Sequence, residues 1–280
     1  MTDTKIGSGK IIEETSHAKV SKTSKYLTYH EVCETEPRYF YAISSLRFND
    51  HLRQLDHLRN CGVEDLDSRC ITFDDGHISQ FQRAFPLLEE YSFKATFFVT
   101  VGWTARRAGY MSWNHLAELV KAGHSIQAHG WSHTHLTQCT DQQLEGELGR
   151  SKLELEDRLG ISVTEMSTPG GRWNASVLRA CASAGYKRIF TSDPWRNIRH
   201  KSGIHTQGRW MVNRSMDANT ISLTVRGHSS FTRLRVEHAV KAAARSVLGD
   251  RRYQELWRLL AQKQSSDENL IQQHDEDTTG

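Results

Sequence analysis

Residues 70–76, Cys-Ile-Thr-Phe-Asp-Asp-Gly, decide the fold. The first four form a short apolar run that predicts a buried strand, and the Asp74-Asp75-Gly76 turn ends it. A second buried strand is predicted at 94–101, which is rich in β-branched and aromatic residues. Between them, apolar residues over 79–90 have helical spacing, with Ser79 as the helix cap. Strand, helix and strand in this order predict a parallel β–α–β unit.

The same alternation continues on both sides of this unit. Further strands are expected at 26–30, 125–128, 163–168 and 187–191, further helices at 48–58, 113–121, 140–159 and 174–184, and two more elements at 210–213 and 219–225. The alternation runs without long linkers and favours parallel strands with crossover helices. Because polar motifs follow the strands directly, a (β/α) barrel of the α/β class is favoured over an open sheet.

The 280 residues suit one sizeable domain with less regular segments at both ends. Residues 1–25 are polar and are predicted to be disordered, and the barrel is expected over 26–225. Residues 226–263 predict two basic helices, which form either a solvated surface or a peripheral contact with an anionic partner. The acidic segment 264–280 is predicted to be a disordered tail.

Composition excludes several classes of protein. The five cysteines are scattered and form no CxxC pair, which argues against a disulfide framework and a thiolate zinc site. A net charge of +3 is too small to indicate a nucleic-acid partner. No run approaches the roughly 20 apolar residues of a membrane span. Since the first 25 residues hold no apolar signal core, we expect a cytoplasmic protein.

Two carboxylates end the strand at 70–73. Successive side chains diverge, so one of Asp74 and Asp75 can bind a metal while the other faces a substrate. Adjacent carboxylates repel each other without a cation, which itself indicates a metal. The alternative is an Asp-Asp-Gly turn that only ends a strand.

Two further motifs follow later strands. His129 and His133, in HGWSH, are four residues apart and can converge on one ion, although exposed loop histidines are the alternative. The run 167–172, STPGGR, precedes a helix, and its small residues let a substrate approach backbone N–H groups that stabilise an oxyanion. A plain strand–helix turn is the alternative here.

Together and in this order, the motifs resemble those of the polysaccharide deacetylase family, which shares the chitooligosaccharide (nodulation factor) deacetylase homology domain. TFDDG resembles the family's first motif and HGWSH its second, and the similarity covers about residues 26–225. The resemblance implies a deformed (β/α) barrel of about seven parallel strands, here with an added C-terminal helical segment.

The resemblance also implies a site. Asp75, His129 and His133 would hold a divalent metal, commonly zinc, with cobalt or another ion as alternatives. Asp74 would act as the general base on the attacking water, and the backbone N–H of Gly170 would help to hold the oxyanion.

Three positions depart from the family pattern. His77 replaces a usual Pro, and either joins catalysis or only completes the turn. Ser167 stands where an Arg normally pairs with the base, so Arg172 would have to reach back to Asp74. The late Leu-x-His that supplies a general acid is not evident over 221–226.

His205 and His228 lie near the place of the missing histidine but lack the right context. The leaving amine would then take its proton from another group, such as His77, or from water.

We expect a metal-dependent hydrolase that removes an acetyl group, most often N-linked, from a saccharide or glycan precursor. The alternatives are a small-amide hydrolase on the same barrel and a catalytically inactive carbohydrate-binding relative. Trp131, Trp173 and Trp195 lie in or beside the motif turns, where they either stack on sugar rings or pack in the core.

Overall fold

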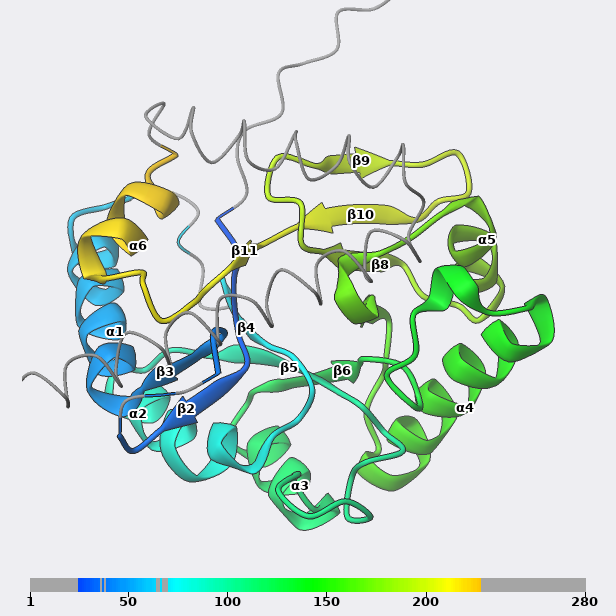
Figure 1. Cartoon of the computed structure of the whole chain (residues 1–280), viewed down its shortest axis with the longest axis horizontal. Coiled ribbons are helices and arrows are strands. Elements are labelled where there is room, and N and C mark those ends of the chain that lie inside the picture. Colours follow the sequence, from blue (N-terminus) through cyan, green and yellow to red (C-terminus); the bar gives the residue numbers. More distant parts are fainter. Residues whose placement is uncertain (1–24, 36, 38, 64–65, 67–69, 228–280) are drawn as a thin grey trace, which may run out of the picture. The chain divides into compact units, whose positions relative to one another are not determined.

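The computed structural model describes residues 25–35, 37, 39–63, 66 and 70–227 (Figure 1). The chain divides into two compact units at Gly227, of which only the first is described. The predicted disordered segment 1–25, apart from Lys25, therefore lies outside the described residues, as do the acidic tail and all but two residues of the basic segment 226–263. Within the described part, no helix is both long and apolar enough to cross a membrane.

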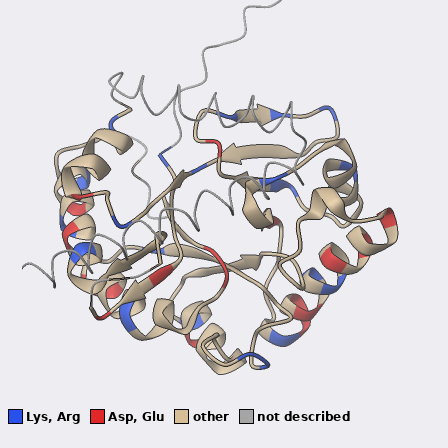
Figure 2. Cartoon of the chain, in the orientation of Figure 1, with Lys and Arg blue, Asp and Glu red and all other residues tan. Residues whose placement is uncertain are grey.

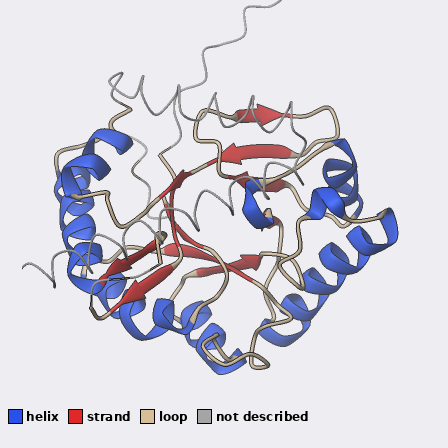
Figure 3. Ribbon diagram, viewed as in Figure 1, coloured by secondary structure: helices blue, strands red, loops and turns tan. Residues whose placement is uncertain are grey.

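One curled sheet forms the centre of the fold (Figure 3). Its nine strands lie in the order β11-β1-β4-β5-β6-β7-β8-β10-β9, and every neighbouring pair is parallel except β9 with β10. The strands are β1 (Leu27–Tyr29), β4 (Ile71–Phe73), β5 (Ala95–Val99), β6 (Ser125–Ala128), β7 (Glu165–Ser167), β8 (Arg188–Thr191), β9 (Asn197–Arg199), β10 (His205–Gly208) and β11 (Trp210–Met211).

The two ends of this sheet are joined by one short run of chain. β10 pairs with β8, β11 pairs with β1, and only Arg209 separates β10 from β11. The N–H of Arg209 donates to Thr191 O (2.9 Å), and the next N–H, of Trp210, donates to Tyr26 O (2.8 Å). The run 205–211 is thus a composite seventh parallel strand that closes the curl, which confirms the predicted deformed barrel.

Helices cover the outside of the sheet, and charged residues lie on several of them (Figure 2). They are α1 (Ser45–Asn60), α2 (Phe85–Glu90), α3 (Trp113–Lys121), α4 (Asp141–Leu159), α5 (Ala175–Ser183) and α6 (Ala218–Val225). Ser112 and Thr140 cap α3 and α4, because each side chain accepts from a backbone N–H of the first turn. Gly160 ends α4 at the predicted residue 159, with the left-handed backbone of a helix C-cap (φ 64°).

The helix predicted over 79–90 differs from its prediction. It begins as a π-helix at Gln80–Ala84 and continues as α2, and Ser79 does not cap it. The Ser79 hydroxyl instead accepts from the N–H of Val32 (3.0 Å). A wider π turn at this place holds the buried Gln80 side chain toward the strand ends.

Four strands were not predicted. β2 (Glu31–Cys33) and β3 (Ala42–Ser44) form a separate two-stranded sheet, and β9 and β10 extend the barrel sheet. Each strand has only three or four residues, β9 is exposed throughout, and β10 reads His-Thr-Gln-Gly. Their pairing therefore depends on the tertiary fold rather than on local preference.

Candidate metal centre and active site

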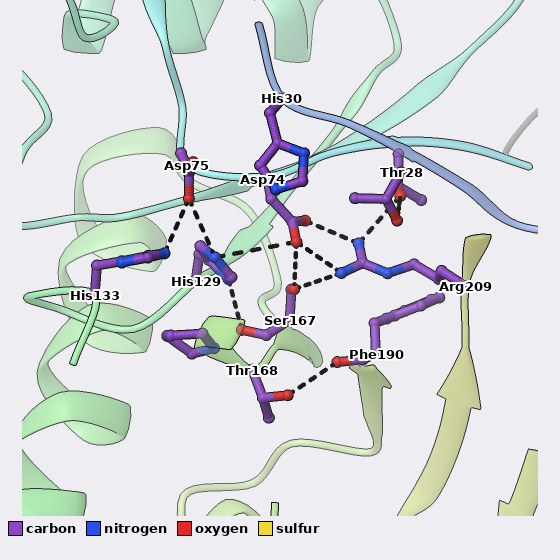
Figure 4. Close-up of polar contacts among 12 residues, drawn as sticks. Thr28, His30, Asp74, Asp75, His129, His133, Ser167, Thr168, Phe190 and Arg209 are labelled. Carbon is purple, nitrogen blue, oxygen red and sulfur yellow. Dashed lines mark hydrogen bonds and ion pairs between the residues drawn. The ribbon is translucent and has the colours of Figure 1, made fainter. Parts of the chain in front are cut away.

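Three side chains converge where β4 and β6 end (Figure 4). Asp75 Oδ1 lies 3.3 Å from His129 Nε2 and 3.1 Å from His133 Nε2, and one ligand atom from each residue lies within 4.8 Å of the others. Asp75 and His133 have positive φ values of 76° and 64°. Non-glycine residues seldom adopt this backbone, and such positions cluster at functional sites.

The donor set fits a divalent cation. His129 Nδ1 is 2.7 Å from the carbonyl oxygen of Ser167, so this nitrogen carries the proton and Nε2 presents a lone pair. That lone pair faces Asp75 Oδ1, which is buried and lacks a well-aligned hydrogen-bond donor. Electron-pair donors that face one another in a buried place need a cation between them, and two imidazoles with one carboxylate are typical zinc ligands.

The electrostatics of the ligands agree with this interpretation. Burial raises the pKa of Asp75, but the adjacent imidazoles of His129 and His133 outweigh it and hold the pKa well below its usual range. Burial lowers the pKa of His129, but Asp74 and Asp75 outweigh it and raise the pKa. The site therefore stabilises positive charge at the point where the ligands meet.

Asp74 lies beside this triad but has different partners. Its Oδ2 is 4.0 Å from His129 Nε2, and it forms a two-pronged ion pair with Arg209, whose Nη1 donates to Oδ1 (2.8 Å) and Nη2 to Oδ2 (2.7 Å). Both side chains are buried. Although burial raises the pKa of Asp74, the charge of Arg209 outweighs it, so the carboxylate stays ionised.

Ser167 connects Asp74 to His129. Its hydroxyl donates to Asp74 Oδ2 (2.9 Å) and accepts from Arg209 Nη2 (2.6 Å), while its carbonyl orients His129. The side chain of Ser167 is too short to take the place of the arginine that normally stands at this position. Arg209, from the strand that closes the barrel, provides the guanidinium instead. Arg209 therefore supplies the guanidinium that the sequence did not place, and a contact of Arg172 with Asp74 stays a prediction.

His30 is a further imidazole at this end of the barrel (Figure 4). It directly follows β1, is almost fully buried, and its Nδ1 has no hydrogen-bond partner. Gln80 Nε2 donates to the carbonyl oxygens of both His30 (2.8 Å) and Asp74 (2.5 Å), which fixes the two strand ends side by side. Burial lowers the pKa of His30 against the raising effect of the two aspartates.

Comparison with known proteins agrees with this geometry. Residues 65–189 match the family model of the polysaccharide deacetylases. The family predicted from the motifs is confirmed for this segment.

Two curated relatives carry names of this family. The Bacillus subtilis protein YxkH, provisionally named a polysaccharide deacetylase, is 31% identical over 149 residues, or 53% of this chain and 53% of the relative. A peptidoglycan-N-acetylglucosamine deacetylase of Bacillus cereus is 30% identical over 133 residues, or 45% of this chain and 60% of that protein. The chain thus spans between half and two thirds of the length of these relatives.

The fold is also that of solved deacetylases. The Streptococcus pyogenes deacetylase PplD, solved in complex with acetate, matches with a TM-score of 0.61 at 23% identity, over 73% of this chain and 99% of that one. At this identity the match shows the fold alone.

His77 lies apart from the triad of Asp75, His129 and His133. Its Nδ1 is 2.8 Å from Ser79 Oγ, and its ring packs against Tyr110 with centroids 5.8 Å apart. No hydrogen bond or ion pair joins it to Asp74 or to a metal ligand in the described part of the chain. The structure thus supports the turn interpretation of His77 and gives no support for a catalytic one.

Gly170 lies three residues beyond Ser167, in a short 3₁₀ turn at Pro169–Gly171. Its φ of +65° suits glycine, and a Cβ here would lie 2.8 Å from His135 Cε1, so a larger residue would not fit. The oxyanion role of its N–H stays a prediction.

His205, which was considered for the missing general acid, does not reach this site. His205 is the first residue of β10, at the opposite end of the strand from Arg209, and it bonds to Asn197 Oδ1. His228 lies outside the described residues.

The aromatic ring packed against the site was not predicted. Trp103 lies with its ring 5.1 Å from that of His133. Trp131 instead packs against two arginines near α4, and Trp195 packs edge-on against Trp210. Trp103 lies in a turn after β5 that carries no motif, so only its place after a strand could have indicated it.

Proposed function

We propose that this chain is a metal-dependent deacetylase that hydrolyses an acetyl group, N-linked in the main case, on a saccharide. The observation that carries the proposal is the convergence of Asp75, His129 and His133 beside the separately paired Asp74. Asp75, His129 and His133 would hold the ion, and zinc suits these ligands. When bound, such an ion supplies Lewis acidity at the carbonyl oxygen of the acetyl group.

Asp74 accepts the proton of the attacking water in this proposal. Its carboxylate is ionised because Arg209 compensates its charge, and the pairing leaves lone pairs on both oxygens for the proton. Arg209 and Ser167 fix the direction of the carboxylate, so they are positioning residues. The N–H of Gly170 would donate to the oxygen that becomes negative when water adds to the carbonyl carbon.

His30 would protonate the leaving nitrogen. It has a buried imidazole next to Asp74 that takes no part in the metal triad, and its Nδ1 has no partner. β1 pairs with β11, so His30 at the end of the first strand lies next to the last strand. The family's late histidine, which this sequence lacks, would follow that last strand. Through this role, C–N cleavage yields acetate and the free amine.

The rival functions have less support. The missing arginine and the missing histidine suggested inactivity. Arg209 offers a guanidinium in place of the first, and His30 offers an imidazole in place of the second. No contact of the site favours a small amide over a saccharide. A glycan precursor as substrate and a cytoplasmic location stay predictions from the sequence.

The decisive test measures acetate release from an N-acetylglucosamine oligomer by the purified, zinc- or cobalt-loaded protein. We expect Asp75→Ala to lose both bound metal and activity. Asp74→Asn is expected to keep the metal and to lose about 100-fold to 10,000-fold in rate, which is the usual contribution of general acid–base catalysis.

The matched control is Asp50→Asn, which changes an exposed aspartate on α1 and should leave metal content and rate unchanged. Acetate release by Asp75→Ala at the wild-type rate would refute the metal assignment. Stoichiometric metal without acetate release from a broad panel of acetylated sugars would instead favour the inactive alternative.

A further inference from the structure

Arg107 lies on a turn that adjoins the metal centre. Trp103, which packs on the metal ligand His133, also contacts Tyr110, with ring centroids 4.7 Å apart. The guanidinium of Arg107 lies over both rings, 4.5 Å from the centroid of Trp103 and 5.1 Å from that of Tyr110. A line of contacts therefore leads from the metal ligand outward to this exposed arginine.

The turn is fixed to the aspartate motif by backbone hydrogen bonds. The N–H of Met111 donates to Gly76 O (2.9 Å), and the N–H of Ile78 donates to Gly109 O (2.8 Å). Gly76 directly follows the Asp74-Asp75 pair. The position of Arg107 is thus set relative to the residues that would carry out the chemistry, and does not depend on a freely moving loop.

The stacking leaves the guanidinium available for an anion. A guanidinium that lies over aromatic rings uses its face, so the N–H donors along its edge stay free for hydrogen bonds. Arg107 forms no ion pair with any carboxylate in the described part of the chain. Glu31 is near enough for its charge to raise the pKa of Tyr110, but it does not pair with Arg107 either. Its neighbour Arg106, by contrast, donates to Glu154 Oε1 (2.8 Å).

A second aromatic side chain belongs to a series of ring contacts that leads to His30. Tyr39 is 48% exposed and contacts Tyr41, which in turn packs on His30. Aromatic rings beside a polar site are typical surfaces for sugar rings. The arginine is the only feature among these contacts that would distinguish a charged sugar from a neutral one.

We infer that Arg107 determines substrate specificity by binding an anionic group of the saccharide, a carboxylate or a phosphate, next to the acetylated sugar. Trp103 and Tyr110 hold the guanidinium in place for this. The inference rests on the proposed deacetylase function and adds the class of saccharide, namely an acidic one.

The test compares three acetylated substrates with the zinc-loaded full chain: a neutral N-acetylglucosamine oligomer, an oligosaccharide that contains a muramic-acid carboxylate, and a phosphorylated N-acetylated sugar. Arg107→Gln should raise KM at least about 10-fold for one anionic substrate, with kcat nearly unchanged, because it removes one charge-assisted contact. The neutral oligomer should be unaffected. The anionic substrate that responds identifies the group that is bound.

Two variants control the experiment. Arg106→Gln removes a neighbouring arginine that already has a carboxylate partner, and should leave all three substrates unchanged. Tyr110→Ala should weaken the same anionic substrate because the guanidinium loses part of its support, whereas Tyr110→Phe should not. An equal change for neutral and anionic substrates on Arg107→Gln would overturn the inference.

Binding separates this inference from the proposed function. The affinity of the two anionic saccharides for the zinc-loaded protein is measured by calorimetry, whether or not acetate is released. If no substrate is hydrolysed but Arg107→Gln still weakens one anionic saccharide, the proposed activity fails and the anion site stands. If Arg107→Gln changes neither affinity, the anion site is refuted even when deacetylation is observed.

Discussion

Strand β6 has a buried histidine at each end, and the two have different partners. His124, before the strand, accepts the N–H of Ala95 at Nδ1 (3.1 Å) and lies 3.1 Å from Glu89 Oε1 through Nε2. His129, after the strand, donates at Nδ1 to a carbonyl, but its Nε2 faces other electron-pair donors. Burial and an acidic neighbour are therefore not enough to mark a ligand. What distinguishes a candidate ligand is a ring nitrogen whose lone pair faces other electron-pair donors and receives no hydrogen bond.

The largest expected effect tests that difference. His129→Gln should lower metal affinity by at least about 100-fold and abolish activity, since even the outer partners of metal ligands are worth about 10-fold to 100-fold. His124→Gln should keep activity within about twofold and lower the free energy of unfolding by about 1–3 kcal/mol, because it disturbs buried hydrogen bonds. Metal titration, acetate release and denaturant unfolding distinguish the two variants. Equal metal affinity in both would contradict the distinction.

A second prediction concerns the buried ion pair of Arg209 with Asp74, which is compared with the exposed ion pair of Lys94 with Glu89 at the other end of the barrel. Arg209→Met leaves Asp74 buried without its counter-charge, so we expect a loss of roughly 3–5 kcal/mol in the free energy of unfolding. Arg209→Lys keeps the charge but loses the two-pronged geometry. Its activity should fall at low pH, with the acidic limb of the rate profile moved to higher pH because the pKa of Asp74 rises.

The exposed ion pair Lys94–Glu89 provides the matched control. Lys94→Met should cost at most about 1 kcal/mol and leave the pH–rate profile unchanged. An Arg209→Lys enzyme with the wild-type acidic limb would show that the arginine does not tune the base.

Ser167 should have a smaller effect. Ser167→Ala removes a hydroxyl that serves Asp74 and Arg209, which we expect to cost about 1.5–3 kcal/mol in the free energy of unfolding, as for hydrogen bonds to charged groups. The carbonyl that orients His129 remains, so metal affinity should be unchanged while the rate falls. A parallel loss of metal affinity would mean that the hydroxyl also supports the metal ligand.

The smallest effect is the pH dependence of stability, which should have opposite signs at the two ends of β6. The pKa of His124 is lowered by burial, so this residue destabilises the fold as pH falls below its unfolded value of about 6.5. The pKa of metal-free His129 is raised, so its contribution is complete below about 6.5 and is lost as pH rises through the folded value. Melting curves of metal-free His124→Gln and His129→Gln between pH 5 and about 9 separate the two contributions. Identical pH slopes in both variants would contradict the assigned shifts.

The sequence predicted the three converging residues better than the residues that surround them. Asp75, His129 and His133 follow apolar strands directly, so strand polarity brings them to one end of the sheet. Arg209 could not be found in this way, because it lies between two short strands and pairs with a residue 135 positions earlier. Nor could His30, whose place beside Asp74 depends on a buried glutamine in a π turn.

The strands show the same division. Long apolar runs such as 94–101 were predicted because their side chains are buried on both faces. The polar β10 was not, because its partner β8 supplies the hydrogen bonds and its own sequence has no strand preference. The local sequence pattern therefore predicts the buried strands of this barrel. The strand that closes the barrel depends on pairing with residues far away in the sequence.

The composite strand 205–211 has a consequence for how the protein is made. A nascent chain that ends before this strand has two open sheet edges, at β1 and β8, and a buried aspartate without its cation. Contacts of such long sequence separation form late and slowly. The strand that closes the barrel thus also brings Arg209 to Asp74. A product truncated before residue 205 would lack both the closure and this ion pair.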